Sequence, residues 1–300
     1  MTASAEKAVI LARGLGTRMR KEDPSAGLSP EQADAACAGV KALIPIVPSW
    51  HGHLAHASQG RPAPANPSMG ETPMPRPFLD YVLSALADAG WRRVCLVIGP
   101  EHDAVRQYYG SLPTRRVRVE FAVQERPRGT ADAVAAAEAF ADGDPFVCIN
   151  SDNYYPVEAL RALREMEGCG LAAFEKDAML AGSNIPPERI GRFAVVRLRA
   201  DGRLEKVVEK PTGEDLEILP GPLHVSMNCW RFDGRIFPAC RAIGPSARGE
   251  LEITDAVQHA IDRMGVPFNV FPCRAAVLDM TGREDIASIA RHLAGTRVDL

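Results

Sequence analysis

A glycine-rich segment near the N-terminus carries residue types that bind phosphate. It runs from Leu11 to Met19 as Leu-Ala-Arg-Gly-Leu-Gly-Thr-Arg-Met and overlaps the end of a short apolar run, Ala8–Ala12. Glycines at a strand end let backbone N–H groups approach a polyphosphate without interference from Cβ atoms. The guanidinium of Arg18 adds a fork of donors for phosphate oxygens. The segment therefore predicts a phosphate-binding loop.

Two other nucleotide-binding motifs do not fit this segment. A dinucleotide-binding loop needs a third glycine where Met19 stands, which disfavours a nicotinamide-dependent dehydrogenase. The Walker motif needs Gly-Lys followed by Ser or Thr, and these residues are missing here. Because glycine-rich turns also occur without function, the loop needs support from other residues.

Two aspartates provide part of that support. Asp152 follows the apolar run Phe146–Ile149, and Asp279 ends a later apolar run. A carboxylate at the C-terminal end of a parallel strand commonly faces a ligand crevice. Mg²⁺ prefers one or two carboxylates with phosphate oxygens completing its shell, so the pair predicts a magnesium site. The alternative for Asp152 is a helix N-cap ahead of Pro156.

The elements that position these residues alternate along the first half of the chain. Continuous apolar runs predict buried strands, and segments of helical spacing that stop at glycine predict helices. Their order favours a parallel sheet with helices on both faces. The predicted strands are Ala8–Ala12, Val94–Ile98, Val117–Val123 and Pro145–Ile149, and the predicted helices are Phe78–Ala89, Asp103–Tyr109 and Thr130–Phe140.

The second half predicts shorter strands joined by turns, including a hairpin turn at Asp201-Gly202. Its predicted strands are Phe193–Leu198, Leu204–Glu209, Val225–Phe232, Phe268–Phe271 and Ala275–Met280, and its predicted helices are Ile253–Met264 and Arg283–Leu293. We therefore expect an α/β fold with a Rossmann-like, mixed and mainly parallel sheet flanked by helices, with extra C-terminal strands.

Composition limits the partners of the 300-residue chain. The formal net charge of −3 provides no basic field for nucleic acid, so no nucleic-acid partner is expected. The seven cysteines are scattered without a Cys-x-x-Cys pair, which is typical of a reducing compartment. The first apolar run is too short for a signal peptide or membrane span. A soluble cytoplasmic protein with no membrane partner is expected.

A long segment from about Lys21 to Pro77 breaks the alternation. It is rich in Pro, Gly, Ser and Ala, and only Val40–Val47 predicts a strand. Loops of this length are usually functional or disordered. A surface loop, a cap over the site, or a contact with a neighbouring subunit are all open, and His51, His53 and His56 within it offer adventitious metal binding.

The loop resembles the Gly-x-Gly-Thr-Arg signature of sugar-1-phosphate nucleotidyltransferases, and further stretches match that family in order. The Arg248–Asp255 stretch is very like one found in glucose-1-phosphate thymidylyltransferases. The matching stretches are Val40–Pro45, Arg76–Leu79, Gln124 with Pro127–Ala131, Phe146–Asn153, Glu209–Pro211, Arg248–Asp255 and Leu278–Gly282. The resemblance covers nearly the whole chain and implies transfer of a nucleoside monophosphate from an NTP to a sugar 1-phosphate with Mg²⁺ as cofactor.

The resemblance also implies roles for individual residues. The catalytic residues would be Arg18, Lys41, Asp152 and Lys210, with Asp152 and Asp279 as metal ligands. The nucleotide would be bound by Leu11, Ala12, Gly14, Gly16, Thr17, Gln124, Gly129 and Thr130, with Gln124 and Gly129 at the base. The sugar would be bound by Asn153, Glu209, Lys210 and Asn228, although core packing is the alternative for Asn228.

We expect one domain over residues 1–300. Residues 1–156 would form a nucleotide-binding half with an insertion at about 21–76, and residues 157–300 a sugar-binding half. The chain departs from the family at Arg13, which replaces a glycine close to the base, and at Asn150-Ser151 before Asp152. Arg13 would either reshape base selection or point outward.

Three functions remain open at this stage. UTP or dTTP with glucose 1-phosphate is favoured, and family members are often homo-oligomers. CTP or GTP with another acceptor, such as mannose 1-phosphate or phosphocholine, is the alternative within the fold. A non-catalytic NDP-sugar-binding regulatory subunit is the third, although none of Arg18, Lys41, Asp152 and Lys210 is lost.

Overall fold

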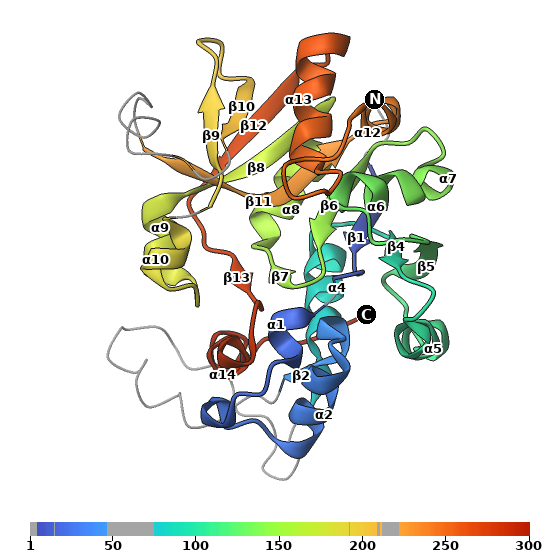
Figure 1. Ribbon diagram of the computed structural model, residues 1–300, viewed down its shortest axis with the longest axis vertical. Helices are drawn as coiled ribbons and strands as arrows, with labels where there is room; N and C mark the ends of the chain where they lie inside the picture. Colours follow the sequence, from blue (N-terminus) through green and yellow to red (C-terminus); the bar gives the residue numbers. More distant parts are fainter. Residues whose placement is uncertain (1–4, 15, 47–74, 192, 209–210, 212–221) are drawn as a thin grey trace.

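The computed structural model describes residues 5–14, 16–46, 75–191, 193–208, 211 and 222–300 and is built around a nine-stranded sheet (Figure 1). The strand order is β10-β9-β11-β6-β1-β4-β5, with β8 beside β11 and β12 beside β8. The strands are β1 (Lys7–Leu11), β4 (Arg93–Ile98), β5 (Arg118–Val123), β6 (Phe146–Asn150), β8 (Cys169–Glu175), β9 (Val195–Leu198), β10 (Leu204–Val208), β11 (His224–Phe232) and β12 (Phe268–Cys273).

The sheet is mixed, which confirms the predicted fold class. Strand β1 runs parallel to β4 and β6, β4 runs parallel to β5, and β12 runs parallel to β8. Strand β11 runs antiparallel to β6, β8 and β9. Because β1, β4, β5 and β6 share one direction, their C-terminal ends meet at one edge, where ligands bind in folds of this type.

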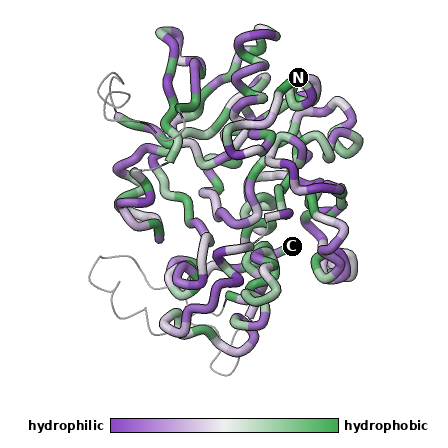
Figure 2. The backbone as a smooth tube through the Cα atoms, in the orientation of Figure 1, coloured by the Kyte–Doolittle hydropathy of each residue, from purple (hydrophilic) through white to green (hydrophobic). Residues whose placement is uncertain are grey.

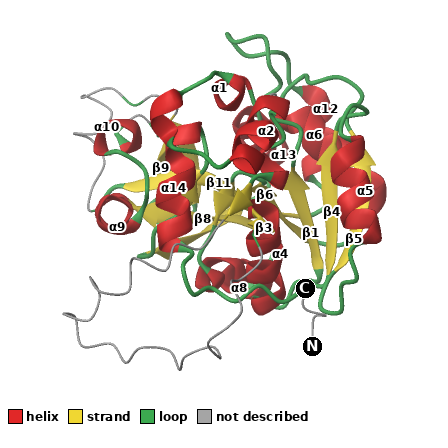
Figure 3. Cartoon of the chain, turned by 90° about the horizontal axis from the view of Figure 1, so that it is seen from below, coloured by secondary structure: helices red, strands yellow, loops and turns green. Residues whose placement is uncertain are grey.

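Helices cover both faces of the sheet (Figure 3). Ala8 and Ile10 pack in one core with α4 (Phe78–Asp88) and α8 (Val157–Glu165). Val9 belongs to a second core on the other face, whose helices are α6 (Thr130–Ala136), α12 (Ile236–Ala242) and α13 (Ile253–Met264). Burial on both faces explains the continuous apolar runs, and the hydrophobic colour follows the central strands and α4 in Figure 2.

The remaining elements lie around the ends of the sheet. They are α5 (Asp103–Ser111), α7 (Glu138–Ala141), α9 (Lys176–Gly182), α10 (Pro187–Ile190), α14 (Arg283–His292) and a two-stranded pair of β7 (Asn153–Tyr154) and β13 (Leu278–Asp279). The single helix predicted over Thr130–Phe140 is instead α6 and α7, because Ala137 leaves helical geometry at φ −90° and ψ 6°. The elements α8, α9, α10, α12, β7 and β8 had not been predicted.

The chain that follows the glycine-rich loop is more regular than predicted. It forms α1 (Thr17–Arg20), a 3₁₀ turn at Pro24–Ala26, α2 (Pro30–Ala38), a second 3₁₀ turn at Lys41–Leu43 and β2 (Pro45–Ile46). Within the described residues, the strand predicted over Val40–Val47 forms only at β2, and Val47 lies outside them. Helix α2 begins at a capping box formed by Ser29 and Gln32 and ends at Gly39, which has φ 72°.

Strand β2 pairs antiparallel with β3 (Arg76–Pro77), so the described residues before and after segment 47–74 lie side by side. Residues 47–74 of the predicted insertion, which include His51, His53 and His56, lie outside the described residues. Within the described ranges, no helix is both long and apolar enough to cross a membrane.

Candidate active site

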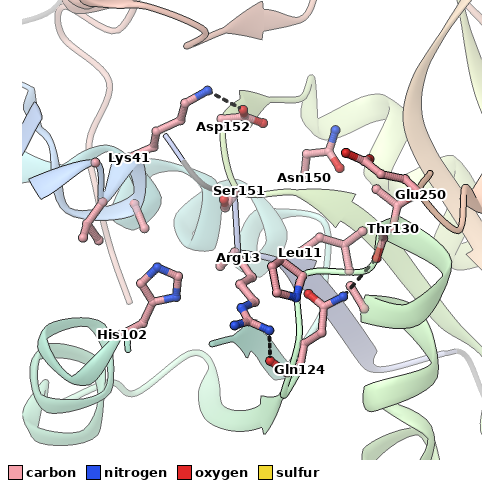
Figure 4. A pocket seen from close by; sticks show the side chains of 18 residues that line it. Leu11, Arg13, Lys41, His102, Gln124, Thr130, Asn150, Ser151, Asp152 and Glu250 are labelled. Carbon is pink, nitrogen blue, oxygen red and sulfur yellow. Dashed lines mark hydrogen bonds and ion pairs between the residues drawn. The ribbon is translucent and has the colours of Figure 1, made fainter. Parts of the chain in front are cut away.

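A cavity of about 390 Å³ lies at the C-terminal ends of the parallel strands (Figure 4). It is formed by the glycine-rich loop after β1, the Lys41 turn, the loops after β4 and β5, and the turn after β6. The structure thus brings together segments that are far apart in the sequence. Eight predicted site residues line it: Leu11, Ala12, Gly14, Lys41, Gln124, Gly129, Thr130 and Asp152.

Lys41 and Asp152 form an ion pair at one end of this cavity. Lys41 Nζ lies 2.9 Å from Asp152 Oδ2, and the two side chains are 16% and 29% exposed. Asp152 sits in the turn after β6, and its carbonyl accepts a hydrogen bond from Met280 N at 2.8 Å. The N-cap alternative for Asp152 is wrong, because α8 begins at Val157 with Pro156 as its cap residue.

Asp279 lies beside Asp152 and is held by three side chains. Asn153 Nδ2 donates to its Oδ1 at 3.0 Å, and Thr281 Oγ1 and Arg189 Nη2 both donate to its Oδ2 at 2.6 Å. The pKa of Asp279 is raised because burial and the negative charge of Asp152 outweigh the hydrogen bond from Thr281 and the charge of Arg189. A positive charge between the two aspartates would therefore stabilise both carboxylates.

This donor set fits a divalent cation. Carboxylate oxygens are the ligands Mg²⁺ prefers, and it usually keeps positions for phosphate oxygens and water. Among the described residues, no group of three or more side chains that could hold a metal is present. The two aspartates would thus require oxygens from a bound ligand to complete the shell.

The opposite end of the cavity is organised by Gln124, and we call it the neutral end because the charges beside it are paired, Arg13 with Glu101 and Arg128 with Asp132. Gln124 Nε2 donates to Gly129 O at 3.0 Å and to Asp132 Oδ2 at 2.9 Å. Because both N–H groups are directed to the protein, the atom that the amide can offer to a ligand is Oε1, an acceptor. The resemblance puts Gln124 at the base, and that role stays a prediction; the structure shows that both N–H groups of its amide are used within the protein.

The loop after Gln124 is held by the segment around Leu251. Leu251 N donates to Arg128 O at 2.7 Å, and Ala131 N donates to Leu251 O at 2.8 Å. Gly129 has φ 122°, and a Cβ there would lie 2.5 Å from Leu251 O. Thr130 Oγ1 accepts from Ile253 N at 2.8 Å, so it also supports the start of α13. The Arg248–Asp255 stretch therefore fixes the shape of this end.

The glycine-rich loop contributes unequally to the cavity. Gly14 lines it, and a Cβ at this position would have no neighbouring atom within 4 Å. Gly16 has φ 60° and packs against Gly39 O so closely that a Cβ would overlap it. Thr17 and Arg18 lie on α1 with exposed side chains and do not line the cavity. A phosphate role for Gly16, Thr17 and Arg18 stays a prediction.

Arg13 points into the protein. Its Nε and Nη2 donate to the two carboxylate oxygens of Glu101, both at 3.1 Å, and its Nη1 donates to Gln124 O. This pairing lowers the pKa of Glu101, with the Arg13 hydrogen bond as the largest cause. The Arg13 side chain is only 7% exposed. Of the two possibilities for Arg13, the outward orientation is thus wrong.

His102 lies next to this pair and lines the cavity. Its Nδ1 accepts from Gly99 N at 3.0 Å, so the neutral ring carries its hydrogen on Nε2. Burial is the main cause that lowers the pKa of His102, which keeps the ring neutral. The residues that line the cavity without having been predicted as ligands include His102, Asn150, Ser151 and Glu250. Asn150, Ser151 and Glu250 lie inside motifs that matched, whereas nothing in the sequence singles out His102.

The predicted sugar-binding residues lie apart from this cavity's lining. Asn153 is buried, accepts from Asn150 Nδ2 at 3.2 Å and supports Asp279. Asn228 has φ 54° at a bulge in β11, and its Oδ1 accepts from Trp230 Nε1 at 3.2 Å. Their contact with a sugar stays a prediction. Glu209 and Lys210 lie outside the described residues.

Comparisons with known proteins identify the family of the chain. The sequence model of the family described as nucleotidyl transferase matches residues 58–273. The glucose-1-phosphate thymidylyltransferase of Streptomyces griseus is 29% identical over 256 residues, covering 85% of this chain and 57% of that protein. The bifunctional protein GlmU of Methanococcus vannielii is 26% identical over 206 residues, covering 68% and 44%. The chain thus spans about half the length of these curated relatives.

Solved structures share the fold. A UDP-glucose pyrophosphorylase in complex with UDP-glucose aligns with a TM-score of 0.64 and 17% identity, over 98% of this chain and 100% of that one. The UDP-glucose pyrophosphorylase of Acinetobacter baumanii aligns with a TM-score of 0.66 and 15% identity, over 98% and 95%. At this identity the likeness establishes the fold.

Proposed function

Because the chain belongs to the nucleotidyl transferase family, we propose that it transfers a nucleoside monophosphate from an NTP to a sugar 1-phosphate, giving an NDP-sugar and pyrophosphate. UTP or dTTP and glucose 1-phosphate are the proposed substrates. The observation that carries the proposal is the cavity itself, which has the Lys41–Asp152 pair beside Asp279 at one end and the acceptor oxygen of Gln124 at the other. A nucleoside triphosphate has a matching arrangement, with charged phosphates at one end and an uncharged base at the other.

The reaction is an in-line displacement. An oxygen of the sugar phosphate forms a bond to the α-phosphorus, the bond from that phosphorus to the bridging oxygen of the β-phosphate breaks, and pyrophosphate leaves with the electron pair. Two anions must meet, so positioning and charge neutralisation supply most of the catalysis. Lys41, which lines the cavity beside Asp152, would donate to the phosphate oxygens.

Asp152 and Asp279 would hold Mg²⁺, which supplies positive charge to the triphosphate and the leaving pyrophosphate. The residues of the chain orient this arrangement. Asn153, Thr281 and Arg189 fix the carboxylate of Asp279, and the hydrogen bond from Met280 N to Asp152 O keeps the two aspartates side by side.

The preference for UTP or dTTP is supported by Gln124. Uracil and thymine carry a hydrogen on ring nitrogen N3, which can donate to Gln124 Oε1, whereas cytosine carries none there. The preference for glucose 1-phosphate is supported by the relatives that are named glucose-1-phosphate thymidylyltransferases.

The test is pyrophosphate release from a panel of NTPs with sugar 1-phosphates in the presence of Mg²⁺. We expect release with UTP or dTTP and glucose 1-phosphate, and slower release with CTP, GTP, mannose 1-phosphate or phosphocholine. Absence of release with every pair would overturn the proposed function.

A further inference from the structure

Arg13 crosses the ends of three strands next to the neutral end of the cavity. It starts from the loop after β1, passes over Gly99 after β4, and reaches Gln124 at the end of β5. Its guanidinium donates hydrogen bonds to both carboxylate oxygens of Glu101. Such a two-point pair fixes the plane of the guanidinium as well as its position.

The space that Arg13 fills is interior space. Its side chain is 7% exposed, whereas that of Glu101 is 50% exposed. A Cβ on Gly99 would overlap the Glu101 carboxylate and lie 2.5 Å from Arg13 Nε, so the absence of a side chain at Gly99 makes room for the pair. Arg13, which lines the cavity, therefore lies over the end of β4 in space that a side chain at position 99 would otherwise take.

Arg13 also acts on Gln124, because its Nη1 donates to the Gln124 backbone carbonyl. The Gln124 side chain is fixed separately by Gly129 O and Asp132. Hydrogen bonds thus hold both the backbone carbonyl and the side-chain amide of Gln124, so its Oε1 has one orientation. An acceptor held in place discriminates more strongly than a mobile one, since it cannot turn to satisfy a wrong partner.

We propose that Arg13, clamped by Glu101, is a specificity-determining residue that restricts the neutral end of the cavity to a single-ring base with a ring N–H. The proposal rests on the proposed function and deepens it. The fused second ring of a purine would need the volume that the Arg13 side chain occupies over Gly99. A pyrimidine with an N3–H leaves that volume to Arg13 and donates to Gln124 Oε1.

The first experiment measures equilibrium binding of UTP, dTTP, CTP, GTP and ATP with Mg²⁺ to the wild type and to Arg13→Gly, without sugar phosphate. Glycine opens the space over Gly99 and releases the Gln124 carbonyl. We expect the ratio of purine to UTP affinity to rise at least ~10-fold, the scale of discrimination by pocket size.

Two further variants separate the clamp from simple loss of volume. Glu101→Gln keeps Arg13 but weakens the two-point pair, and we expect a smaller shift in the same direction, about 3-fold. Arg13→Lys keeps the charge without the fork and should resemble Glu101→Gln rather than the wild type. Arg115→Gly, at an exposed arginine remote from the cavity, should leave the ratio unchanged.

Each outcome separates this inference from the proposed function. If the wild type binds no NTP, both are overturned. If it binds UTP or dTTP and the purine ratio stays the same in Arg13→Gly, this inference is overturned while the proposed function stands. If all variants lose every nucleotide equally and also lose thermal stability, Arg13 is structural and the inference is likewise overturned.

Discussion

The two ends of the cavity each contain a cation paired with a carboxylate, but their charge balance differs. At the neutral end, Arg13 lowers the pKa of Glu101, so this carboxylate is stabilised by the protein alone. At the charged end, the pKa of Asp279 is raised, because burial and Asp152 outweigh the hydrogen bond from Thr281 and the charge of Arg189. At the neutral end, the protein itself supplies the positive charge that the carboxylate needs. At the charged end, an added positive charge would stabilise the carboxylates further.

Under the proposed function, this difference gives the two ends different tasks. A site whose groups are already satisfied presents a fixed shape, which suits discrimination between bases. A site with two neighbouring carboxylates in a partly buried setting favours a cation that arrives with the substrate. Substitutions at the charged end should therefore change turnover, and those at the neutral end should change selectivity.

Asp152→Asn tests the charged end with the largest expected effect. Loss of one carboxylate charge should lower kcat for pyrophosphate release by at least ~100-fold, the scale seen when a group that neutralises transition-state charge is removed. The shape of the side chain is kept, so the melting temperature should change little. Asp262→Asn, at an exposed aspartate, is the control. Near-normal kcat in Asp152→Asn would show that the two aspartates hold no catalytic cation.

Lys41→Met tests the cation of the same end. The methionine keeps most of the apolar stem but removes the charge that, under the proposed function, neutralises the phosphates, so kcat should fall about 10- to 100-fold. Selectivity among NTPs should stay as in the wild type. Lys206→Met at an exposed position controls for a general loss of charge. A change in base preference without a change in kcat would contradict the expectation that the charged end determines turnover and the neutral end determines selectivity.

Gly16→Ala tests whether the glycine-rich loop depends on its contact with Gly39 near Lys41. Gly16 and Gly27 have φ 60° and 59°, but only a Cβ at Gly16 would overlap Gly39 O, while Gly27 has open space. The matched control Gly27→Ala should cost about 1 kcal/mol through its left-handed backbone alone. Gly16→Ala should cost about 2–4 kcal/mol, measured by urea unfolding. Equal losses in the two variants would show that the contact is unimportant.

His102→Asn tests the neutral end through pH and should have the smallest effect. The folded pKa of His102 lies below its ordinary value of 6.5, so on acidification the unfolded chain binds a proton before the folded chain does. The stability due to the neutral ring is therefore present above pH 6.5 and is lost as the pH falls toward the folded pKa. Asn places an oxygen near the Nδ1 position and does not titrate.

The melting temperature of His102→Asn should thus fall less than that of the wild type between pH 7.5 and 5.5, by about 1–3 °C. His292→Asn, at an exposed histidine, is the control for the loss of an imidazole outside the cavity lining. The same pH dependence in His102→Asn and the wild type would mean that the ring protonates freely in the folded protein.

The central strands and the aspartate after one of them could be predicted, because each is visible in a short stretch of sequence. Apolar runs such as Val94–Ile98 are buried on both faces, so their composition alone indicates central strands. Asp152 was found because it lies three residues after the end of such a run, Phe146–Ile149. Helix α2 was missed although its capping box at Ser29 and Gln32 is readable, because the high Pro and Gly content around it suggested an irregular segment.

The remaining parts depend on contacts between distant segments. Glu101 and His102 enter the site because β4 lies next to β1 in the sheet, which brings the loop after β4 against Arg13. The role of Leu251 depends on contact with Gly129, a residue 122 positions earlier. Single-sequence patterns describe one segment at a time and contain no information on such pairs.

The ladder between β2 and β3 has a consequence for how the chain tolerates change. Pro45 pairs with Pro77 and Ile46 with Arg76, so the chain enters and leaves segment 47–74 at adjacent points. The placement of Lys41 relative to α4 is then independent of how many residues lie between. Because the entropy of closing a loop grows only slowly with its length, this is a position where a whole module can be gained, lost or exchanged during evolution while the catalytic frame keeps its geometry.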